Sequence, residues 1–322
     1  MPTPEQRPGA DISDHITLSR RGYLGVLAGA GVVGVAGCVG LDENSVSVLA
    51  AGSLARTFED YIGPAFEADT DTAVHAEYFG SNAIMRMVED RMKQPDVVVS
   101  ADATLLRDRL YGEFTDWDVE FATNSLGIGY NPDTTLGQRL DDGAPWYEPV
   151  RETDDGAIAI GDPDLDPLGY RAVMAFELAE REHDLEGFRE EMMARVHTEP
   201  DEPQMMAGVE SGSRAAAVVY HNMAVDRGMP FVEFPDAYSF GNPDLADHYA
   251  TVTFTTDEEG YTAEGRPVLY NTTVHNDADE PAAGRRLVQF LVDNPDLLAD
   301  AGLGVDDSLP ELTGDPPEEL DI

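Results

Sequence analysis

The sequence contains one cysteine, Cys38, and one lysine, Lys93. A lone cysteine excludes an internal disulfide framework and a metal site made of several cysteines. Lysine and arginine together number 20 of the 322 residues, against 63 aspartates and glutamates, and the formal net charge is -43. Because no basic patch is available to neutralise phosphates, the sequence argues against nucleic acid as a partner.

The acidic residues are spread along the chain rather than massed in one block. Such a charge is typical of proteins of extreme halophiles, because concentrated salt screens repulsion beyond about 3 Å at 1 M. A basic partner or a store of cations is the alternative explanation. The hydrophobic share of 42% is ordinary for a globular protein, and the length allows two domains or one large bilobal domain.

The N-terminal segment has the features of an export signal. Arg20 and Arg21 precede an apolar, glycine-rich run over 26–37 that is too short for a comfortable membrane span. The arginine pair is similar to a twin-arginine signal, and the small residues that lead into Cys38 are similar to a lipobox. We therefore expect cleavage before Cys38, a lipid on its sulfur, and a body held at the outer face of the cell membrane. An uncleaved helical anchor is the alternative, and it also places the body outside the cell.

Beyond this segment, short apolar runs alternate with amphipathic stretches. The apolar runs predict strands at 47–51, 74–78, 96–100, 121–130, 157–161, 215–220, 231–234, 251–255 and 267–274. Helical periodicity predicts helices at 52–68, from 80 onwards, at 103–110, over 168–195 with a break near His183 or Gly187, and at 281–298. The acidic, proline-bearing end after Leu309 is expected to be loosely ordered. Strands alternating with helices predict the α/β class with parallel sheets, in which ligands bind at the carboxyl ends of strands.

Two expected strand-to-helix junctions have the same form, AAGSL at 50–54 and FGSNA at 79–83. In each, glycine lets the backbone approach a ligand, and Ser53 or Ser81 stands where a helix begins. Two helix N-termini that face one cleft would make an oxyanion site, to which the two hydroxyls add donors. Plain helix capping is the alternative explanation.

Two further segments carry polar residues at element ends. GDPDLDPLGYR at 161–171 places Asp166 directly before a proline that can open a helix, where a carboxylate commonly caps. VESG at 209–212 is followed by VVY at 218–220, so Glu210 and Tyr220 are a helix-end charge and a strand-end aromatic on the simplest interpretation.

Taken in order, these segments resemble molybdate-binding proteins of the type II periplasmic-binding fold, and most closely their archaeal molybdate/tungstate-binding branch. AGSL at 51–54, GS at 80–81, VSAD at 99–102, DPLGYR at 166–171, VESG with VVY at 209–220 and PVLY at 267–270 follow the family order, and the resemblance covers about 45–303. It implies an α/β bilobal fold with two α/β lobes joined by crossover strands. The organisation expected on that basis is a twin-arginine lipoprotein signal (1–37), a tether (38–45), a discontinuous lobe 1 (46–122 and 250–310), a lobe 2 (123–249) and an acidic tail (311–322).

The resemblance also implies which groups hold the oxyanion. Ser53 and Ser81 would donate hydroxyl and amide hydrogen bonds from lobe 1. The backbone N–H of Leu168 and the hydroxyl of Tyr220 would donate from lobe 2.

In the archaeal branch two carboxylates also reach the metal of the oxyanion, and the matching positions are Asp166 and Glu210. A carboxylate repels a dianion, so it disfavours sulfate and phosphate, whose central atoms do not readily accept further ligands. Molybdenum and tungsten can accept two more oxygens, which turns the repulsion into coordination. The stretch between Val196 and Met205 is shorter than in that branch, so a further ligand-facing amide near Glu202 is left open.

The implied function is that of an extracytoplasmic substrate-binding lipoprotein of an ABC importer. It would capture tungstate or molybdate between its lobes and deliver the anion to a membrane permease served by a cytoplasmic ATPase. We expect a monomer without a cofactor and without enzymatic activity. The two anions share charge and shape, so the sequence does not rank them, and the same fold binding sulfate, phosphate or another anion is the nearest alternative.

A secreted hydrolase that uses Asp166 and Glu210 as an acid/base pair is the remote alternative. The sequence has no G-x-S-x-G or H-E-x-x-H motif, and its seven histidines are scattered. Asn271 opens a glycosylation sequon, but within an expected buried strand.

Overall fold

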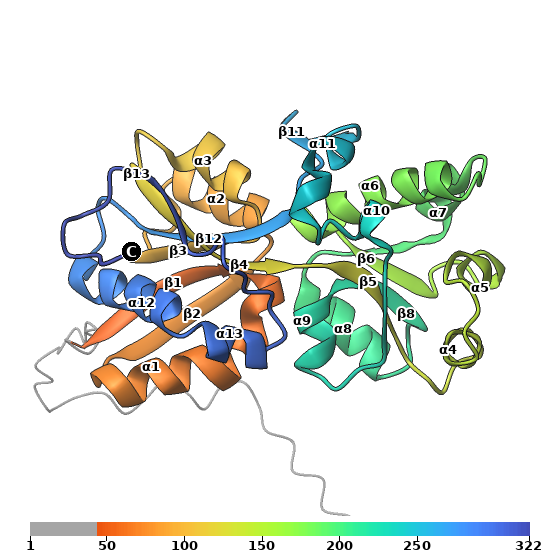
Figure 1. The fold of residues 1–322 in the computed structure, drawn as a ribbon, viewed down its shortest axis with the longest axis horizontal. Helices are drawn as coiled ribbons and strands as arrows, with labels where there is room; N and C mark the ends of the chain where they lie inside the picture. The colour runs from red at the N-terminus through yellow and green to blue at the C-terminus, as the bar shows by residue number, and fades with distance from the viewer. Residues whose placement is uncertain (1–43) are drawn as a thin grey trace, which may run out of the picture. The chain divides into compact units, whose positions relative to one another are not determined.

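The computed structural model describes residues 44–322, which form two mixed sheets with helices on both faces of each (Figure 1). We call the six-stranded sheet with its helices lobe 1 and the five-stranded sheet with its helices lobe 2. Two α/β lobes are the architecture that the sequence predicted.

The sheet of lobe 1 has the strand order β13-β4-β12-β3-β1-β2. Its strands are β1 (Ser45–Ala51), β2 (Ala73–Phe79), β3 (Val97–Ser100), β4 (Trp117–Asn124), β12 (Val268–Val274) and β13 (Glu311–Gly314). β1 runs parallel to both of its neighbours, β2 and β3, and the register aligns their carboxyl ends. The junctions that follow these three strands therefore meet at one edge of the sheet.

The sheet of lobe 2 has the order β7-β6-β8-β5-β9, and a separate hairpin pairs β10 with β11. The strands are β5 (Leu126–Tyr130), β6 (Ile158–Gly161), β7 (His197–Glu199), β8 (Ala216–Tyr220), β9 (Phe231–Glu233), β10 (Thr253–Thr255) and β11 (Thr262–Glu264). β6 runs parallel to β7 and β8, whereas β5 is antiparallel to its neighbours. The expectation of parallel sheets therefore holds for β1, β2 and β3 and for β6, β7 and β8, whereas the other pairs in both sheets are antiparallel.

The helices cover both faces of each sheet (Figure 1). In lobe 1 they are η1 (Gly52–Leu54), η2 (Thr57–Ile62), α1 (Gly63–Thr70), α2 (Ser81–Glu89), α3 (Ala103–Leu110), α12 (Pro281–Asp293) and α13 (Pro295–Asp300). The helical segments between β5 and β10 are α4 (Thr135–Asp141), α5 (Tyr147–Glu152), α6 (Pro167–Glu182), α7 (Phe188–Arg195), α8 (Glu202–Glu210), α9 (His221–Val225), α10 (Asp236–Ser239), η3 (Pro243–Leu245) and α11 (Ala246–Tyr249). Figure 1 shows α2 and α3 on one face of the first sheet with α1, α12 and α13 on the other, and α6 and α7 opposite α8 and α9 on the second.

Two connections join the lobes. Only Ser125 separates β4 from β5, so the chain passes directly from one sheet to the other (Figure 1). The chain returns to lobe 1 between β9 and β12, and Gly241 on this return lies against the first connection. A Cβ at Gly241 would lie 2.8 Å from the Cβ of Ser125, so the absence of a side chain lets the two connections approach each other.

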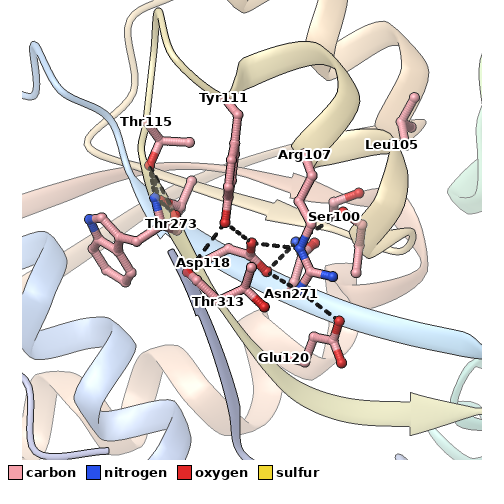
Figure 2. Close-up of polar contacts among 12 residues, drawn as sticks. Ser100, Leu105, Arg107, Tyr111, Thr115, Asp118, Glu120, Asn271, Thr273 and Thr313 are labelled. Carbon is pink, nitrogen blue, oxygen red and sulfur yellow. Dashed lines mark hydrogen bonds and ion pairs between the residues drawn. The ribbon is translucent and has the colours of Figure 1, made fainter. Parts of the chain in front are cut away.

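A buried polar cluster joins α3 to β4 and β12 in lobe 1 (Figure 2). Arg107 donates to both carboxylate oxygens of Asp118, at 2.8 and 2.9 Å, and to Glu120 at 2.7 Å. Tyr111 also donates to Asp118, and Asn271 Nδ2 donates to it at 2.8 Å. Asp118 and Asn271 are both fully buried. The amide nitrogen that a glycan would modify is therefore inside the sheet and already bonded.

The long helical stretch breaks as expected, since α6 ends at Glu182 and α7 begins at Phe188. The end of the chain differs from the expectation of loose order. Glu311–Gly314 forms β13, which pairs antiparallel with β4, and Leu312 packs against the hydrophobic core. Without this pairing β4 would be an unpaired sheet edge, which explains why an acidic segment is ordered here.

The expected export signal and lipidation site, Arg20, Arg21 and Cys38, lie outside the described residues. Within residues 44–322, no helix combines the length and apolar character needed to cross a membrane.

Candidate functional site

Ser53 follows β1 in the short turn η1 and is buried where lobe 1 meets lobe 2. Its backbone N–H donates to Glu202 Oε1 of α8 at 3.1 Å, and its Oγ is 3.0 Å from the hydroxyl of Tyr270 on β12. A Cβ on the preceding residue, Gly52, would lie 2.2 Å from Glu202 Oε2. Glycine is therefore required for the carboxylate to come this close to the backbone.

Ser81 opens α2 at the end of β2 and is fully buried. Its Oγ accepts a hydrogen bond from the backbone N–H of Ala101, which follows β3, at 3.0 Å. A Cβ at Gly80 would lie 2.2 Å from the carbonyl oxygen of Leu165 and 3.0 Å from the Cβ of Asp166. Both glycine–serine junctions of lobe 1 thus face carboxylate-bearing segments of lobe 2.

Asp166 lies between β6 and α6 and is the N-cap of α6, as its position before a proline predicted. Its Oδ1 accepts the backbone N–H of Leu168 at 3.0 Å. Its Oδ2 is buried and has no hydrogen-bond partner within the described residues. The N–H of Leu168, expected to donate to the anion, is therefore used by the adjacent carboxylate.

Glu202 begins α8 after β7, behind the N-cap Asp201. One carboxylate oxygen, Oε1, accepts the Ser53 N–H, whereas Oε2 is buried and lacks a partner among residues 44–322. A polar atom in this position is costly unless a partner is supplied. Within residues 44–322, no other residue donates to Asp166 Oδ2 or Glu202 Oε2, so the only proton available to these two oxygens is one that the pair itself retains.

The two carboxyl groups affect each other's titration. Burial raises the pKa of Glu202 well above its usual range, and the charge of Asp166 raises it further. Burial also raises the pKa of Asp166, although the Leu168 N–H, the Arg171 guanidinium and a hydrogen bond with the Glu202 side chain oppose that shift. Interacting buried carboxyls titrate as a pair, so this pair keeps a proton at pH values where free carboxyls are ionised.

Tyr220 ends β8, and its hydroxyl oxygen accepts a hydrogen bond from Arg171 Nη1 at 2.9 Å. Arg171, on α6, also donates to the carbonyl oxygen of Ala101 and to Asp102 Oδ2, both at 2.9 Å. The hydroxyl of Tyr170 donates to the same oxygen of Asp102 at 2.6 Å. Arg171 therefore links lobe 2 to lobe 1 directly behind Tyr220, a role for which the sequence offered no pattern beyond its place in DPLGYR.

Glu210, which the resemblance implied as the second carboxylate, lies elsewhere. Its Oε1 is 3.8 Å from Arg56 Nη2 and 3.4 Å from Arg227 Nε, and its side chain is 41% exposed. Glu202 is 1% exposed. The two glutamates stand at opposite ends of α8, about 12 Å apart along its axis. The structure therefore brings Glu202, and not Glu210, to Asp166.

We call Ser53, Ser81, Asp166, Glu202 and Tyr220 the interlobe cluster. The oxygens of Ser81 and Tyr220 each accept a bond from a donor behind them, and no acceptor for either hydroxyl proton is found among residues 44–322. Among residues 44–322, the cluster thus holds two hydroxyl protons without an acceptor, on Ser81 and Tyr220. Beside them lie two carboxyl oxygens, Asp166 Oδ2 and Glu202 Oε2, to which no other residue donates. A group that carries several acceptor oxygens and also accepts carboxylate oxygens would satisfy both.

The fold and this cluster define a class of protein. Two α/β lobes joined by crossover strands, with polar groups from strand ends of both lobes gathered between them, are the architecture of type II periplasmic binding proteins. The chain belongs to the bacterial extracellular solute-binding protein family, whose model matches residues 46–302.

Proteins similar in sequence come from several archaea. The chain is 51% identical over 304 residues to an uncharacterized solute-binding protein of Halobacterium salinarum, covering 94% of this chain and 98% of the relative. It is 37% identical over 307 residues to a protein of Haloferax volcanii provisionally named an ABC transporter molybdenum-binding protein, covering 93% and 96%. It is 27% identical over 278 residues to the molybdate/tungstate-binding protein of Thermococcus kodakarensis, covering 78% of each chain.

Among solved structures, the periplasmic molybdate-binding protein of Azotobacter vinelandii matches with a TM-score of 0.58 at 14% identity, covering 81% of this chain and 100% of that chain. At this identity the likeness concerns the fold alone. It confirms the bilobal type II fold that the sequence predicted.

Proposed function

We propose that this protein is the substrate-binding component of an ABC importer and that it binds molybdate or tungstate between its lobes. The carrying observation is the interlobe cluster: in the described part of the chain, no residue outside the pair donates to Asp166 Oδ2 or Glu202 Oε2, and no acceptor takes the Ser81 and Tyr220 hydroxyl protons. A tetrahedral oxyanion supplies acceptor oxygens to the hydroxyls, and its central metal can take the carboxylate oxygens. The names of the Haloferax and Thermococcus relatives support this choice of ligand.

In the proposed site the Ser53, Ser81 and Tyr220 hydroxyls donate to the anion. Asp166 and Glu202 coordinate its metal, with Glu202 replacing Glu210 in the set that the resemblance implied. The Leu168 N–H holds Asp166 in place, and it reaches the anion only if Asp166 Oδ1 turns away.

The two carboxylates account for selectivity. A sulfate or phosphate placed beside them meets negative charge without compensation, and burial strengthens that repulsion. A molybdate or tungstate centre accepts the carboxylate oxygens as ligands, so the same residues stabilise the complex. The pair must release its retained proton on coordination, which makes the preference depend on pH.

The test is the thermal stability of the purified protein in about 2 M KCl, which screens surface charge. Tungstate, molybdate, sulfate and phosphate are added in turn. A ligand specific for the folded state stabilises it by about 2.7 kcal/mol at a hundredfold excess over its dissociation constant. Glu202→Gln and Asp166→Asn should lose the shift. Glu210→Gln, the same change at the other end of α8, is the matched control and should keep it.

A shift with tungstate and molybdate alone, lost in Glu202→Gln, supports the proposed site. A shift with sulfate or phosphate would assign a different anion to the same fold. The absence of a shift with any of the four anions would reject the proposed function and reopen the hydrolase alternative.

We propose further that Arg20 and Arg21 direct export and that lipid on Cys38 holds the protein at the outer face of the membrane, where a permease and its ATPase receive the anion. Cys38→Ser should move the protein from the membrane fraction to the medium. Retention of this variant in membranes would argue for an uncleaved anchor instead.

A further inference from the structure

Asn124, the last residue of β4, has a side-chain amide whose orientation is determined by its neighbours. Its Oδ1 accepts the backbone N–H of Ser125 at 2.9 Å and that of His221 at 3.1 Å. Backbone N–H groups only donate, so the atom that they contact is the oxygen. Nδ2 therefore points the other way, where it donates to Asn222 Oδ1 at 2.9 Å and to the Tyr270 hydroxyl at 3.3 Å.

The orientation of the Asn124 amide determines the direction of the hydrogen bond between Tyr270 and Ser53. The phenolic oxygen of Tyr270 accepts from Asn124, so its own proton needs another partner. Tyr270 is fully buried, and Ser53 Oγ, at 3.0 Å, is the only acceptor that residues 44–322 offer to that proton. Buried hydroxyls donate where an acceptor exists. Tyr270 therefore donates to Ser53, and the proton of Ser53 is directed away from Tyr270.

The other two hydroxyl oxygens of the interlobe cluster, those of Ser81 and Tyr220, also accept a hydrogen bond from a protein donor. The Ala101 N–H donates to Ser81 Oγ at 3.0 Å, and Arg171 Nη1 donates to the Tyr220 oxygen at 2.9 Å. In each case a donor from behind occupies the oxygen and leaves its proton for another acceptor. Ser53 differs because its donor is itself a hydroxyl, whose direction depends on Asn124.

We propose that Asn124 and Tyr270 are positioning residues that turn the Ser53 hydroxyl proton toward the bound oxyanion. They make Ser53 a donor at the site, as Ser81 and Tyr220 already are. Neither Asn124 nor Tyr270 needs to touch the anion for this effect. The inference rests on the proposed function, because it presumes an oxyanion beside Ser53.

A double-mutant cycle tests the role of Tyr270. Tungstate affinity is measured by calorimetry for the wild type, Ser53→Ala, Tyr270→Phe and the double variant. Ser53→Ala should weaken binding about 10–100-fold, the usual loss of a hydrogen bond to a charged group. Tyr270→Phe should weaken tungstate binding about 3–10-fold in the wild-type background. In the Ser53→Ala background it should weaken binding by less than about 2-fold, because Tyr270 acts only through the Ser53 hydroxyl. An equal loss in both backgrounds would overturn the proposal.

Asn124→Asp tests the direction of the hydrogen bonds that link Asn124 to Tyr270 and Tyr270 to Ser53. The carboxylate has the same shape but accepts where the amide donated, so Tyr270 turns its proton to residue 124 and Ser53 turns its proton to Tyr270. Asn124→Asp should therefore bind tungstate more weakly than Tyr270→Phe, and adding Tyr270→Phe to it should restore part of the affinity. The proposal would be contradicted if the double variant lost affinity by the product of the two single-variant losses. It would also be contradicted if Asn124→Asp bound tungstate like the wild type.

Two matched changes at residues outside the interlobe cluster control for altered charge and lost hydrogen bonds. Asn131→Asp alters an amide bonded to Val209 and Asp133, and Tyr249→Phe alters a buried tyrosine bonded to Asp236. Both should bind tungstate like the wild type. If the wild type binds none of the oxyanions, the proposed function fails together with this inference. If the wild type binds and the Ser53–Tyr270 cycle is additive, only the positioning role fails.

Discussion

The backbone N–H of Ser53 in lobe 1 donates to Glu202 Oε1 in lobe 2 at 3.1 Å, although the two residues are 149 positions apart. An N–H at a strand-to-helix junction is the kind of donor that oxyanions use. The Glu202 carboxylate thus accepts the bond that an anion at this junction would accept. The two residues join the lobes where the ligand is proposed to bind.

Gly52→Ala should weaken tungstate binding at least about 10-fold, or about 1.4 kcal/mol. Its Cβ would lie 2.2 Å from Glu202 Oε2, so the carboxylate has to move away. Gly208→Ala is the control, because its Cβ would lie 3.1 Å from the flexible Arg214 side chain and 3.6 Å from Ser213 Oγ, and neither contact involves Glu202. Calorimetric titration measures the tungstate affinity of both variants. Equal affinities would contradict the proposal that Glu202 lies at the binding site.

Tungstate affinity should rise with pH. Burial raises the pKa of both Asp166 and Glu202, and coordination of the metal requires them to be ionised. Titrations in buffers of different ionisation enthalpy should show release of about one proton per anion near neutral pH. Glu202→Gln should release fewer protons. Affinity that falls as pH rises would count against metal coordination by this pair.

Tungstate affinity should rise with pH, but the stability that Asp166 contributes to the anion-free protein should fall with pH. A carboxyl group whose pKa is raised by folding contributes stability at low pH, and this contribution is lost as pH rises from the unfolded value near ~4 through the raised value. Asp166→Asn removes the loss, so its unfolding free energy relative to the wild type should increase between about pH 5 and 8. Denaturant titrations of both proteins across this pH range measure the trend, and a difference that stays constant with pH would contradict it.

Arg171→Met should destabilise the protein by about 3–5 kcal/mol, because it leaves a buried charge without its partner. Arg171 is 2% exposed and holds Asp102 at 2.9 Å. Arg181→Met should cost less than about 1 kcal/mol, since Arg181 is 48% exposed in its pair with Glu177. Denaturant titration compares the two, and similar losses would refute the importance of the buried pair.

Asn271→Asp should destabilise lobe 1 by about 1–3 kcal/mol. The change replaces the donor to buried Asp118 with a second acceptor of like charge (Figure 2). Asn276→Asp, at an exposed position five residues later, is the control and should change stability little. An unchanged thermal midpoint for Asn271→Asp would contradict a stabilising role for the bond from Asn271 to Asp118.

Periodicity and junction chemistry predicted much of the molecule. The apolar runs located the principal strands. Glycine followed by serine at two expected junctions singled out Ser53 and Ser81, and an aspartate directly before a helix-opening proline singled out Asp166. These features are local, because a strand end and a helix start a few residues apart determine them. The break between α6 and α7 was predictable for the same reason.

Features that depend on the packing of distant segments were not predictable in this way. Glu202 and Glu210 stand at opposite ends of α8, and only the approach of lobe 1 distinguishes them. Glu202 did carry a local signal, since it starts a helix after a strand, as Asp166 does, but a charge at that position is also an ordinary helix start. The pairing of β13 with β4 and the bond from Arg171 to Asp102 likewise join segments far apart in the sequence.

The order of strands in lobe 1 bears on how the protein is made. β4 lies between β12 and β13, and both of these come from the last part of the chain. During synthesis β4 therefore leaves the ribosome with both of its edges unpaired, a state that favours association with other chains. Lobe 1 cannot complete its sheet until β12 and β13 have been synthesised. Its assembly should consequently be slow, because its essential contacts join segments far apart in the sequence.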